Sequence, residues 1–404
     1  MTPPPPARVR WATRAMAFGL VVFVLGLAVF AATRLAPGDV AATPAPSAAT
    51  LASPMTTPAP DPTPTPEPTP TPTPPPTLEA LVGQKLIVRM DGSAPGTGLL
   101  RRAELGEIGG VVLSGAQARS EEQVGAVARA LQASARAGGQ PPLLIMVAQE
   151  GGGIRAFEWA QPVRSATRMA RMEADEIRSM GAAAGRALAA AGVNVNLAPV
   201  ADVPGKGASF MRDTMRTWSA DPERTARSVT AFAEGLASQD VLAAVKHFPG
   251  IGRVARSTDR FVETVEASRK ALDRDLVPFR AAIDAGVPLV MLSNATYTAL
   301  DPDNAAGWSR AIVQDLLRGE LGFGGVAMTA SLTGTARARK VDVETVAGDA
   351  VAAGVDMVVI TTPEEGSEAV YRRLLQLARE GTLDRAALET SHARILALKA
   401  TLAD

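Results

Sequence analysis

Polar and cationic side chains follow several short apolar runs of the sequence, at the points where those runs end. Asp202 comes shortly after one such run, Lys246 and His247 close another, and Arg216 lies in the segment between them. Together they offer several donors and acceptors for the hydroxyl or carboxylate groups of a ligand. The same set can also form an ion-pair network that binds nothing, and the residues alone leave both interpretations open.

Other chemistries are disfavoured by composition. Two histidines and no cysteine exclude a disulfide scaffold and argue against a transition-metal site, so we expect no metal and no cofactor. The 41 basic and 41 acidic side chains leave no basic face for nucleic acid, and no nucleic-acid partner is expected.

The apolar runs alternate with amphipathic, Ala-rich stretches. The expected strands are 85–89, 110–113, 143–147, 193–199, 242–247, 288–292, 325–329 and 357–360. The expected helices are 121–137, 174–191, 222–238, 269–285 and 309–321. This alternation predicts an α/β fold, a (β/α)8 TIM-type barrel, with a doubly wound open sheet as the alternative. The least regular part is the first crossover, which is short and Gly-rich.

A barrel would gather the polar strand ends on one rim. Active sites of such barrels lie at the carboxyl ends of the strands. Asp202, Lys246 and His247 are therefore predicted to face one another there, with Arg216 on a loop above them.

The N-terminal part predicts a membrane-anchored protein. Residues 1–14 form a basic tail, and residues 15–33 are an uncharged, largely apolar stretch long enough to span a bilayer as a transmembrane signal-anchor helix. The excess of arginine before this stretch keeps the N-terminus cytoplasmic and places the remainder outside the membrane. A signal peptide that is cleaved, followed by secretion, is the alternative.

A spacer separates this stretch from the barrel. Residues 34–77 are rich in Pro and Thr and predict a disordered, extended linker with no packed core. Residues 78–404 are long enough for the barrel domain.

A series of motifs runs through this domain in order. They are AQEGG (148–152), NVNLAPVADV (194–203), RTWSADP (216–222), KHFPGIG (246–252) and LRGELGFGGVAMTASL (317–332). The series resembles glycoside hydrolase family 3, and it is most similar to the bacterial β-N-acetylglucosaminidases that consist of the barrel domain alone. The resemblance extends from about Leu81 to Lys399.

The resemblance implies a retaining mechanism, but the catalytic positions are substituted. Ala330 stands where the family has its nucleophilic aspartate, and a methyl group cannot form the glycosyl-enzyme bond. Ser331, next to it, is an unactivated hydroxyl and a poor substitute. The acid/base dyad of the family falls on Ser257 and Asp259, so that Asp259 occupies the acid/base position of the loop. We therefore assign no catalytic residue.

The sugar-binding positions are better preserved. Arg216, Lys246 and His247 match residues that hydrogen-bond the sugar in the family, whereas Ala148 replaces an aspartate and Asn294 a histidine. The resemblance thus implies a site that keeps its cations and has lost most of its carboxylates.

The aromatic residues and the last histidine are given structural roles. Trp159, Trp218 and Trp308 fall in loops, and we expect Trp218 to pack under the rim, with stacking on a sugar as the alternative. His392 lies on the last expected helix, where a surface position is predicted.

These features predict an extracytoplasmic, membrane-anchored and catalytically degenerate family member. It would bind an N-acetylglucosamine-containing glycan, a peptidoglycan fragment or a partner at the cell wall. The first alternative is an active β-N-acetylhexosaminidase that uses a displaced carboxylate among Glu150, Asp202 and Asp259, which requires two carboxyl groups about 5 to 5.5 Å apart. The second is a non-carbohydrate interaction module on a stalk.

Overall fold

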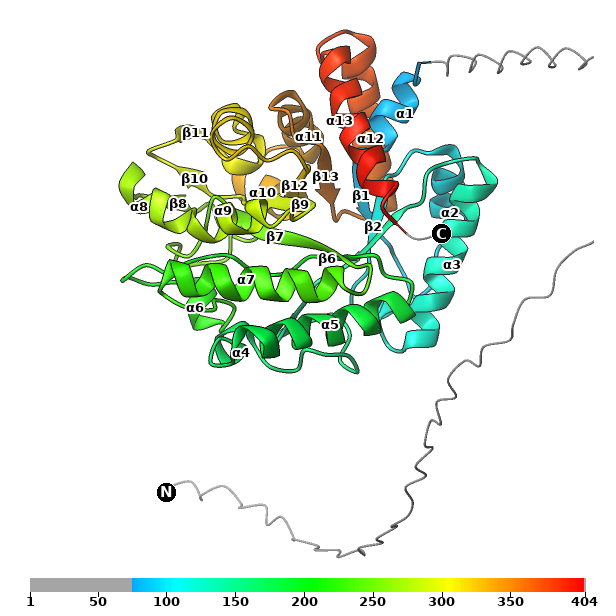
Figure 1. Cartoon of the computed structure of the whole chain (residues 1–404). Coiled ribbons are helices and arrows are strands. Elements are labelled where there is room, and N and C mark those ends of the chain that lie inside the picture. Colours follow the sequence, from blue (N-terminus) through cyan, green and yellow to red (C-terminus); the bar gives the residue numbers. More distant parts are fainter. Residues whose placement is uncertain (1–74, 403–404) are drawn as a thin grey trace, which may run out of the picture. The chain divides into compact units, whose positions relative to one another are not determined.

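The computed structural model describes residues 75–402 (Figure 1). The predicted basic tail, the apolar stretch 15–33 and nearly all of the linker 34–77 lie outside these residues. Within the described part of the chain, no helix is both long enough and apolar enough to cross a membrane.

Eight parallel strands close into a barrel. Their order around it is β1-β13-β12-β9-β7-β6-β3-β2, so the strands follow one another in sequence. The strands are β1 (Leu86–Arg89), β2 (Gly110–Val112), β3 (Leu144–Val147), β6 (Val195–Asn196), β7 (Leu242–Phe248), β9 (Leu289–Leu292), β12 (Val326–Ser331) and β13 (Met357–Ile360). The predicted (β/α)8 barrel is confirmed, and the open sheet is wrong because β1 pairs with both β2 and β13, which leaves no edge strand.

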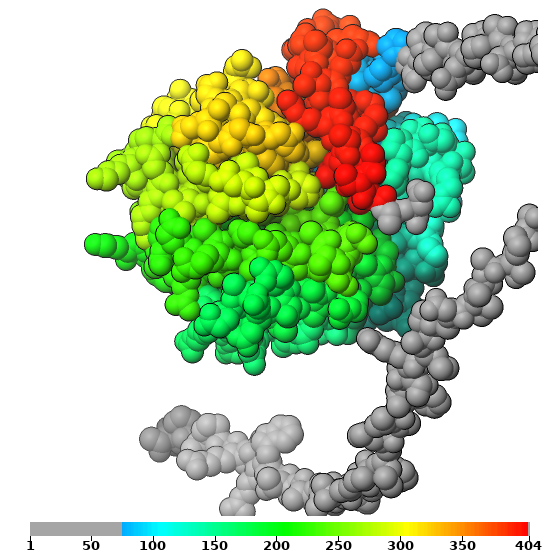
Figure 2. Space-filling model, in the orientation of Figure 1, coloured from blue at the N-terminus to red at the C-terminus, as the bar shows by residue number. Residues whose placement is uncertain are grey.

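Helices surround the barrel (Figure 1). They are α1 (Leu78–Gly83), α2 (Thr97–Leu105), α3 (Glu121–Ala137), α4 (Ala166–Met169), α5 (Ala174–Ala190), α6 (Phe210–Asp213), α7 (Pro222–Ala237), α8 (Arg269–Asp275), α9 (Val277–Asp284), α10 (Leu332–Arg339), α11 (Val343–Ala352), α12 (Glu364–Arg379) and α13 (Arg385–Lys399). Two short 3-10 helices, η1 (Gly115–Gln117) and η2 (Ala306–Trp308), and a π-helix, η3 (Ala311–Glu320), complete the set. Figure 2 shows the C-terminal helices, in red, beside α1, in blue.

Five short strands of the described chain lie in the loops at the carboxyl ends of the barrel strands. β4 (Gln149–Gly151) pairs with β5 (Ile154–Arg155) directly after β3. β8 (Thr264–Val265), β10 (Thr296–Tyr297) and β11 (Asp301–Ala305) form a second small sheet. Both lie in loops that follow barrel strands, where sequence analysis places the polar residues.

The structure departs from the predicted elements in three places. The Gly-rich first crossover holds a helix after all, α2. The helix expected over 269–285 is two helices, α8 and α9, and Pro278 lies in the first turn of α9. Proline has no N–H to continue the preceding helix, so it favours a new start there. The strand expected over 193–199 shrinks to the two residues of β6.

The barrel interior is a separate apolar group. Alternate strand residues point inward, so Met328 and Ala330 of β12 belong to this group, whereas Ala327 packs against the surrounding helices. Ile395 and Leu398 of α13 join the interior group. Helix α13 thus packs at the amino ends of the strands and leaves the carboxyl ends for the site.

This position of α13 corrects one prediction. His392 was expected on the surface, but only 9% of it is exposed. Burial, together with the nearby charges of Lys85 and Lys399, lowers its pKa. Alanines lie on several faces of α13, so the sequence does not show which face is buried. The face that carries His392 is covered in the structure.

Candidate functional site

One carboxylate holds two cations at the carboxyl ends of β3 and β7. Glu150, in β4, accepts two hydrogen bonds from Arg216, from Nε at 2.8 Å and from Nη2 at 2.7 Å. Its Oε1 also lies 2.6 Å from Nζ of Lys246. The side chains of Glu150 and Lys246 are each 5% exposed and that of Arg216 is 14% exposed. The three side chains therefore form a nearly buried ion triad, in which two cations and one carboxylate leave a net charge of one positive unit.

The charge state of Glu150 follows from these contacts. Burial by itself would raise the pKa of Glu150, but Lys246 and Arg216 lower it to about 2 through their charges and hydrogen bonds. Sequence analysis named Glu150 only as a possible displaced carboxylate and missed it as the partner of both cations. The sequence signal that could have identified this role is a single acidic residue shortly after the expected strand 143–147.

A second pair lies beside the triad. Asp202, fully buried, accepts from His247 Nδ1 at 2.8 Å and from the backbone N–H of Ile251 at 2.7 Å. Because the carboxylate accepts at Nδ1, a neutral imidazole carries its proton there. Nε2 has no hydrogen-bond partner within residues 75–402 and is left as an acceptor for a ligand hydroxyl.

The loop after β6 is held by contacts with β7 and with Trp218. Val200 forms a bridge with Lys246 at the end of β7, and the indole N–H of Trp218 donates to the Val200 carbonyl at 2.9 Å. Trp218 is 4% exposed and packs against Phe232, with ring centroids 6.0 Å apart. Trp218 packs under the rim, as predicted, and positions the segment that leads to Asp202.

Two alanines face the mouth of the barrel. Ala330, 7% exposed, belongs to the interior apolar group near the end of β12, and Ala148, at the end of β3, packs against the same group. Ser331 is turned to a different neighbour, since its Oγ lies 2.6 Å from Oγ1 of Thr361. Ala148 and Ala330 thus place methyl groups at the carboxyl ends of β3 and β12.

The loop after β7 brings Asp259 toward this group. Burial lowers the pKa of Arg216, but the charge and hydrogen bonds of Glu150, followed by the charges of Asp202 and Asp259, raise it above its ordinary value. Asp259 itself is exposed. Its neighbour Arg256 binds Glu263 at 2.7 Å instead of Asp259. Within residues 75–402, Asp259 is therefore the one of the three candidate carboxylates whose side chain binds no other side chain.

The order of these motifs and the barrel match a known family. The family model for the glycosyl hydrolase family 3 N-terminal domain matches residues 97–398. The chain belongs to glycosyl hydrolase family 3. A β-hexosaminidase of Nitrosomonas eutropha is 34% identical over 278 residues, which cover 66% of this chain and 77% of that protein.

Solved structures agree with this family. A family 3 β-N-acetylglucosaminidase from a Paenibacillus species superposes with a TM-score of 0.77 at 30% identity, covering 80% of this chain and 62% of that one. A β-N-acetylhexosaminidase from Beutenbergia cavernae gives a TM-score of 0.74 at 30% identity, covering 80% of this chain and 98% of that one. The chain is thus similar to family 3 β-hexosaminidases, and it spans less than two thirds of the Paenibacillus protein.

Two of the three candidate carboxylates are engaged in contacts within the site. Glu150, with a pKa of about 2, cannot donate a proton near neutral pH, and both of its oxygens contact cations. Asp202 is occupied by His247 and a backbone N–H. Among the described residues, no group of three or more His, Asp or Glu side chains could hold a metal ion. Arg216, His247 and Asp259 keep exposed atoms that can contact a ligand.

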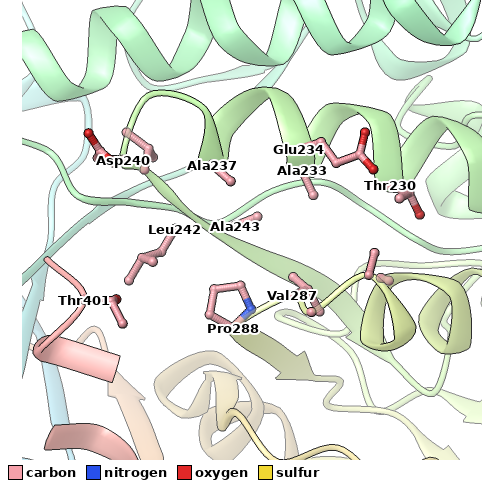
Figure 3. A pocket seen from close by; sticks show the side chains of 14 residues that line it. Thr230, Ala233, Glu234, Ala237, Asp240, Leu242, Ala243, Val287, Pro288 and Thr401 are labelled. Atoms are coloured by element: carbon pink, nitrogen blue, oxygen red, sulfur yellow. The ribbon is translucent and has the colours of Figure 1, made fainter. Parts of the chain in front are cut away.

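A groove of the family 3 barrel lies far from this chemistry. A cavity of about 260 Å³ runs between α7 and α9 at the amino end of β7, lined by Ala237, Leu242, Val287, Pro288 and Thr401 (Figure 3). Leu242 begins β7 and Pro288 precedes β9, whereas Lys246 and His247 lie near the carboxyl end of β7. The groove is mainly apolar and shares no residue with the ion triad.

Proposed function

We propose that this family 3 barrel binds an N-acetylglucosamine-containing sugar at the rim and does not hydrolyse it through the covalent route. The single observation that carries this proposal is the side chain of Ala330, a methyl group in the apolar interior at the end of β12. A retaining glycosidase needs a carboxylate that bonds to the sugar, and a methyl group has no lone pair to offer.

The other carboxylates support the same conclusion. A retaining site needs two carboxyl groups near the sugar, one as nucleophile and one as acid/base. Glu150 is held by two cations and Asp202 by His247, which leaves Asp259 alone and exposed. Freeing Glu150 would leave Arg216 and Lys246 buried without a counter-charge.

Binding is supported by the pairing of polar and apolar surface. A pyranose ring has hydroxyl groups around its edge and C–H groups on its faces. Arg216 and His247 keep 14% and 12% of their side chains exposed, and the methyl groups of Ala148 and Ala330 lie at the carboxyl ends of β3 and β12. Hydroxyl groups would meet the cation and the free Nε2 of His247, and a ring face would meet the methyl groups.

We further propose that the barrel works outside the cytoplasmic membrane, tethered by the apolar stretch 15–33 and the linker 34–77. In that location the ligand is a cell-wall glycan, such as a peptidoglycan fragment. Recovery of the full chain in the membrane fraction, and its release when residues 1–33 are deleted, would support the tether. Recovery of an intact full chain in the soluble fraction would overturn it.

An active β-N-acetylhexosaminidase is the second candidate. The similarity to proteins named β-hexosaminidases favours it. In this chain it must use Asp259, because Glu150 and Asp202 are occupied.

One assay separates the two candidates. The full chain and a Lys246→Ala variant are incubated with a chromogenic β-N-acetylglucosaminide, and calorimetry measures N-acetylglucosamine binding to both. We expect sugar binding by the wild type, its loss in the variant, and no hydrolysis above the buffer rate. Hydrolysis by the wild type that Lys246→Ala and Asp259→Asn both abolish would establish the active candidate instead.

An Ala330→Asp variant adds a positive test. It restores only the nucleophile position, so we expect slow release of an activated aryl group, which needs no protonation to leave. Glycosyl transfer to the introduced carboxylate would be seen as an added sugar mass on the intact protein.

A further inference from the structure

Trp159 is an exposed aromatic ring that the structure holds rigidly. It lies in the loop after β5, nine residues from Glu150 in the sequence, and 39% of it is exposed. One face stacks on Phe157, with ring centroids 4.8 Å apart and planes at 15°. Its indole N–H donates to the carbonyl of Ala118 at 3.4 Å. The exposed surface therefore belongs to the ring's other face and outer edge.

The loop that carries Trp159 is organised by the residue next to Glu150. Gln149, fully buried, accepts from the N–H of Phe157 at 2.9 Å. Its amide donates to the carbonyls of Phe157 at 3.1 Å, Ala160 at 3.3 Å and Gln161 at 3.0 Å. Gln149 thus fixes both sides of Trp159, and the adjacent Glu150 fixes the cations of the site.

Two more exposed apolar residues lie close to Trp159 in the sequence. Ile154, in β5, is 37% exposed, and Val163, in the loop after β5, is 55% exposed. An exposed indole held at one face and at its N–H has little side-chain freedom left to lose when a ligand binds. The loop therefore presents a preformed apolar platform at the rim of the barrel.

We propose that Trp159 is the platform for a second sugar ring, so that the ligand of this site is an oligosaccharide and not a single N-acetylglucosamine. The proposal rests on the proposed function, because the first ring must occupy the site of Arg216, Lys246 and His247. The C–H groups on one face of a pyranose match an aromatic face in shape and polarity. With 39% of Trp159 exposed, part of the residue stays open to solvent, which fits a ligand better than a packing role.

The test is a calorimetric titration of the full chain with N-acetylglucosamine and with its β-1,4-linked dimer, trimer and tetramer. We expect affinity to rise at the length that reaches Trp159. A Trp159→Ala variant should lose that rise, a decrease of about tenfold for the longer sugars. It should bind the monosaccharide as the wild type does. Trp159→Phe keeps an aromatic face and should retain most of the rise, and Glu158→Gln, at an exposed position of the same loop, is the matched control.

Three other outcomes would overturn the proposal, and each contradicts a different part of it. If the monosaccharide binds and Trp159→Ala keeps the full length dependence, the platform is wrong while the proposed function stands. If Trp159→Ala weakens the monosaccharide and the oligomers equally, Trp159 acts on the first ring or on the fold. If the wild type binds no sugar of any length, the proposed function and the platform both fall.

Discussion

Glu150 and Arg216 form a two-pronged ion pair, with each of two guanidinium nitrogens within 2.8 Å of a different carboxylate oxygen. The two residues are separated by 66 positions in the sequence and come from loops after neighbouring strands of the barrel. Such planar, charge-assisted contacts are among the stronger hydrogen bonds in proteins. Lys246 completes the group, so one carboxylate decides the electrostatics of the rim.

Replacing Glu150 should damage both stability and ligand binding. Glu150→Gln leaves Arg216 and Lys246 buried without a counter-ion, which we expect to lower the free energy of unfolding by about 3–5 kcal/mol. Urea unfolding measures this change. Glu158→Gln, at an exposed position of the same loop, is the matched control and should change little. Equal stability of the two variants would contradict the importance of the triad.

Stability should also depend on pH through Glu150. The pKa of Glu150 is about 2 in the folded chain, against an ordinary value of 4.5. A lowered carboxyl pKa contributes stability above about pH 4.5, and the contribution is lost as the pH falls toward 2. It amounts to about 3 kcal/mol in total. Unfolding free energies measured from pH 6 down to 2 should fall more steeply in the wild type than in Glu150→Gln, and parallel curves would refute this.

Lys399 should make the free energy of unfolding depend on pH in the alkaline range. It is 2% exposed, it donates to Gln84 Oε1 at 2.6 Å, and burial lowers its pKa from 10.5 to about 7. Between these values the unfolded chain binds a proton that the folded chain does not, so the free energy of unfolding rises with pH. Lys399→Met should flatten this rise between about pH 7 and 10. Lys270→Met, at an exposed lysine, should leave it unchanged.

Gly334 controls how closely the Asp259 loop approaches α10. A Cβ atom at this position would lie 2.4 Å from the carbonyl oxygen of Asp259. Gly334→Ala should therefore displace the loop and destabilise the chain by about 1–3 kcal/mol. Hydrogen exchange should accelerate at residues 257–261. Gly324→Ala, where a Cβ would meet no atom within 4 Å, is the control. Unchanged hydrogen exchange at residues 257–261 in Gly334→Ala would contradict the displacement of this loop.

Much of the fold was predictable because it rests on local patterns. Alternating apolar runs and amphipathic stretches encode strands and helices through their periodicity, and eight such units close into a barrel. The motif series likewise indicated the family that the comparisons show. Ala330 was recognisable from its place in a motif. The anchor at 15–33 and the linker stay predictions, since they lie outside the described residues.

Only the tertiary structure decided which groups meet. No local pattern states that Glu150 contacts Arg216 and Lys246, because ion pairing depends on distances in space between loops from different strands. The same holds for His392, which is covered because α13 packs on the barrel end. The rigid setting of Trp159 depends in turn on four hydrogen bonds of the buried Gln149 side chain. Sequence specifies the side chains and their order, and packing then determines which charges are neutralised and which surfaces stay free to bind.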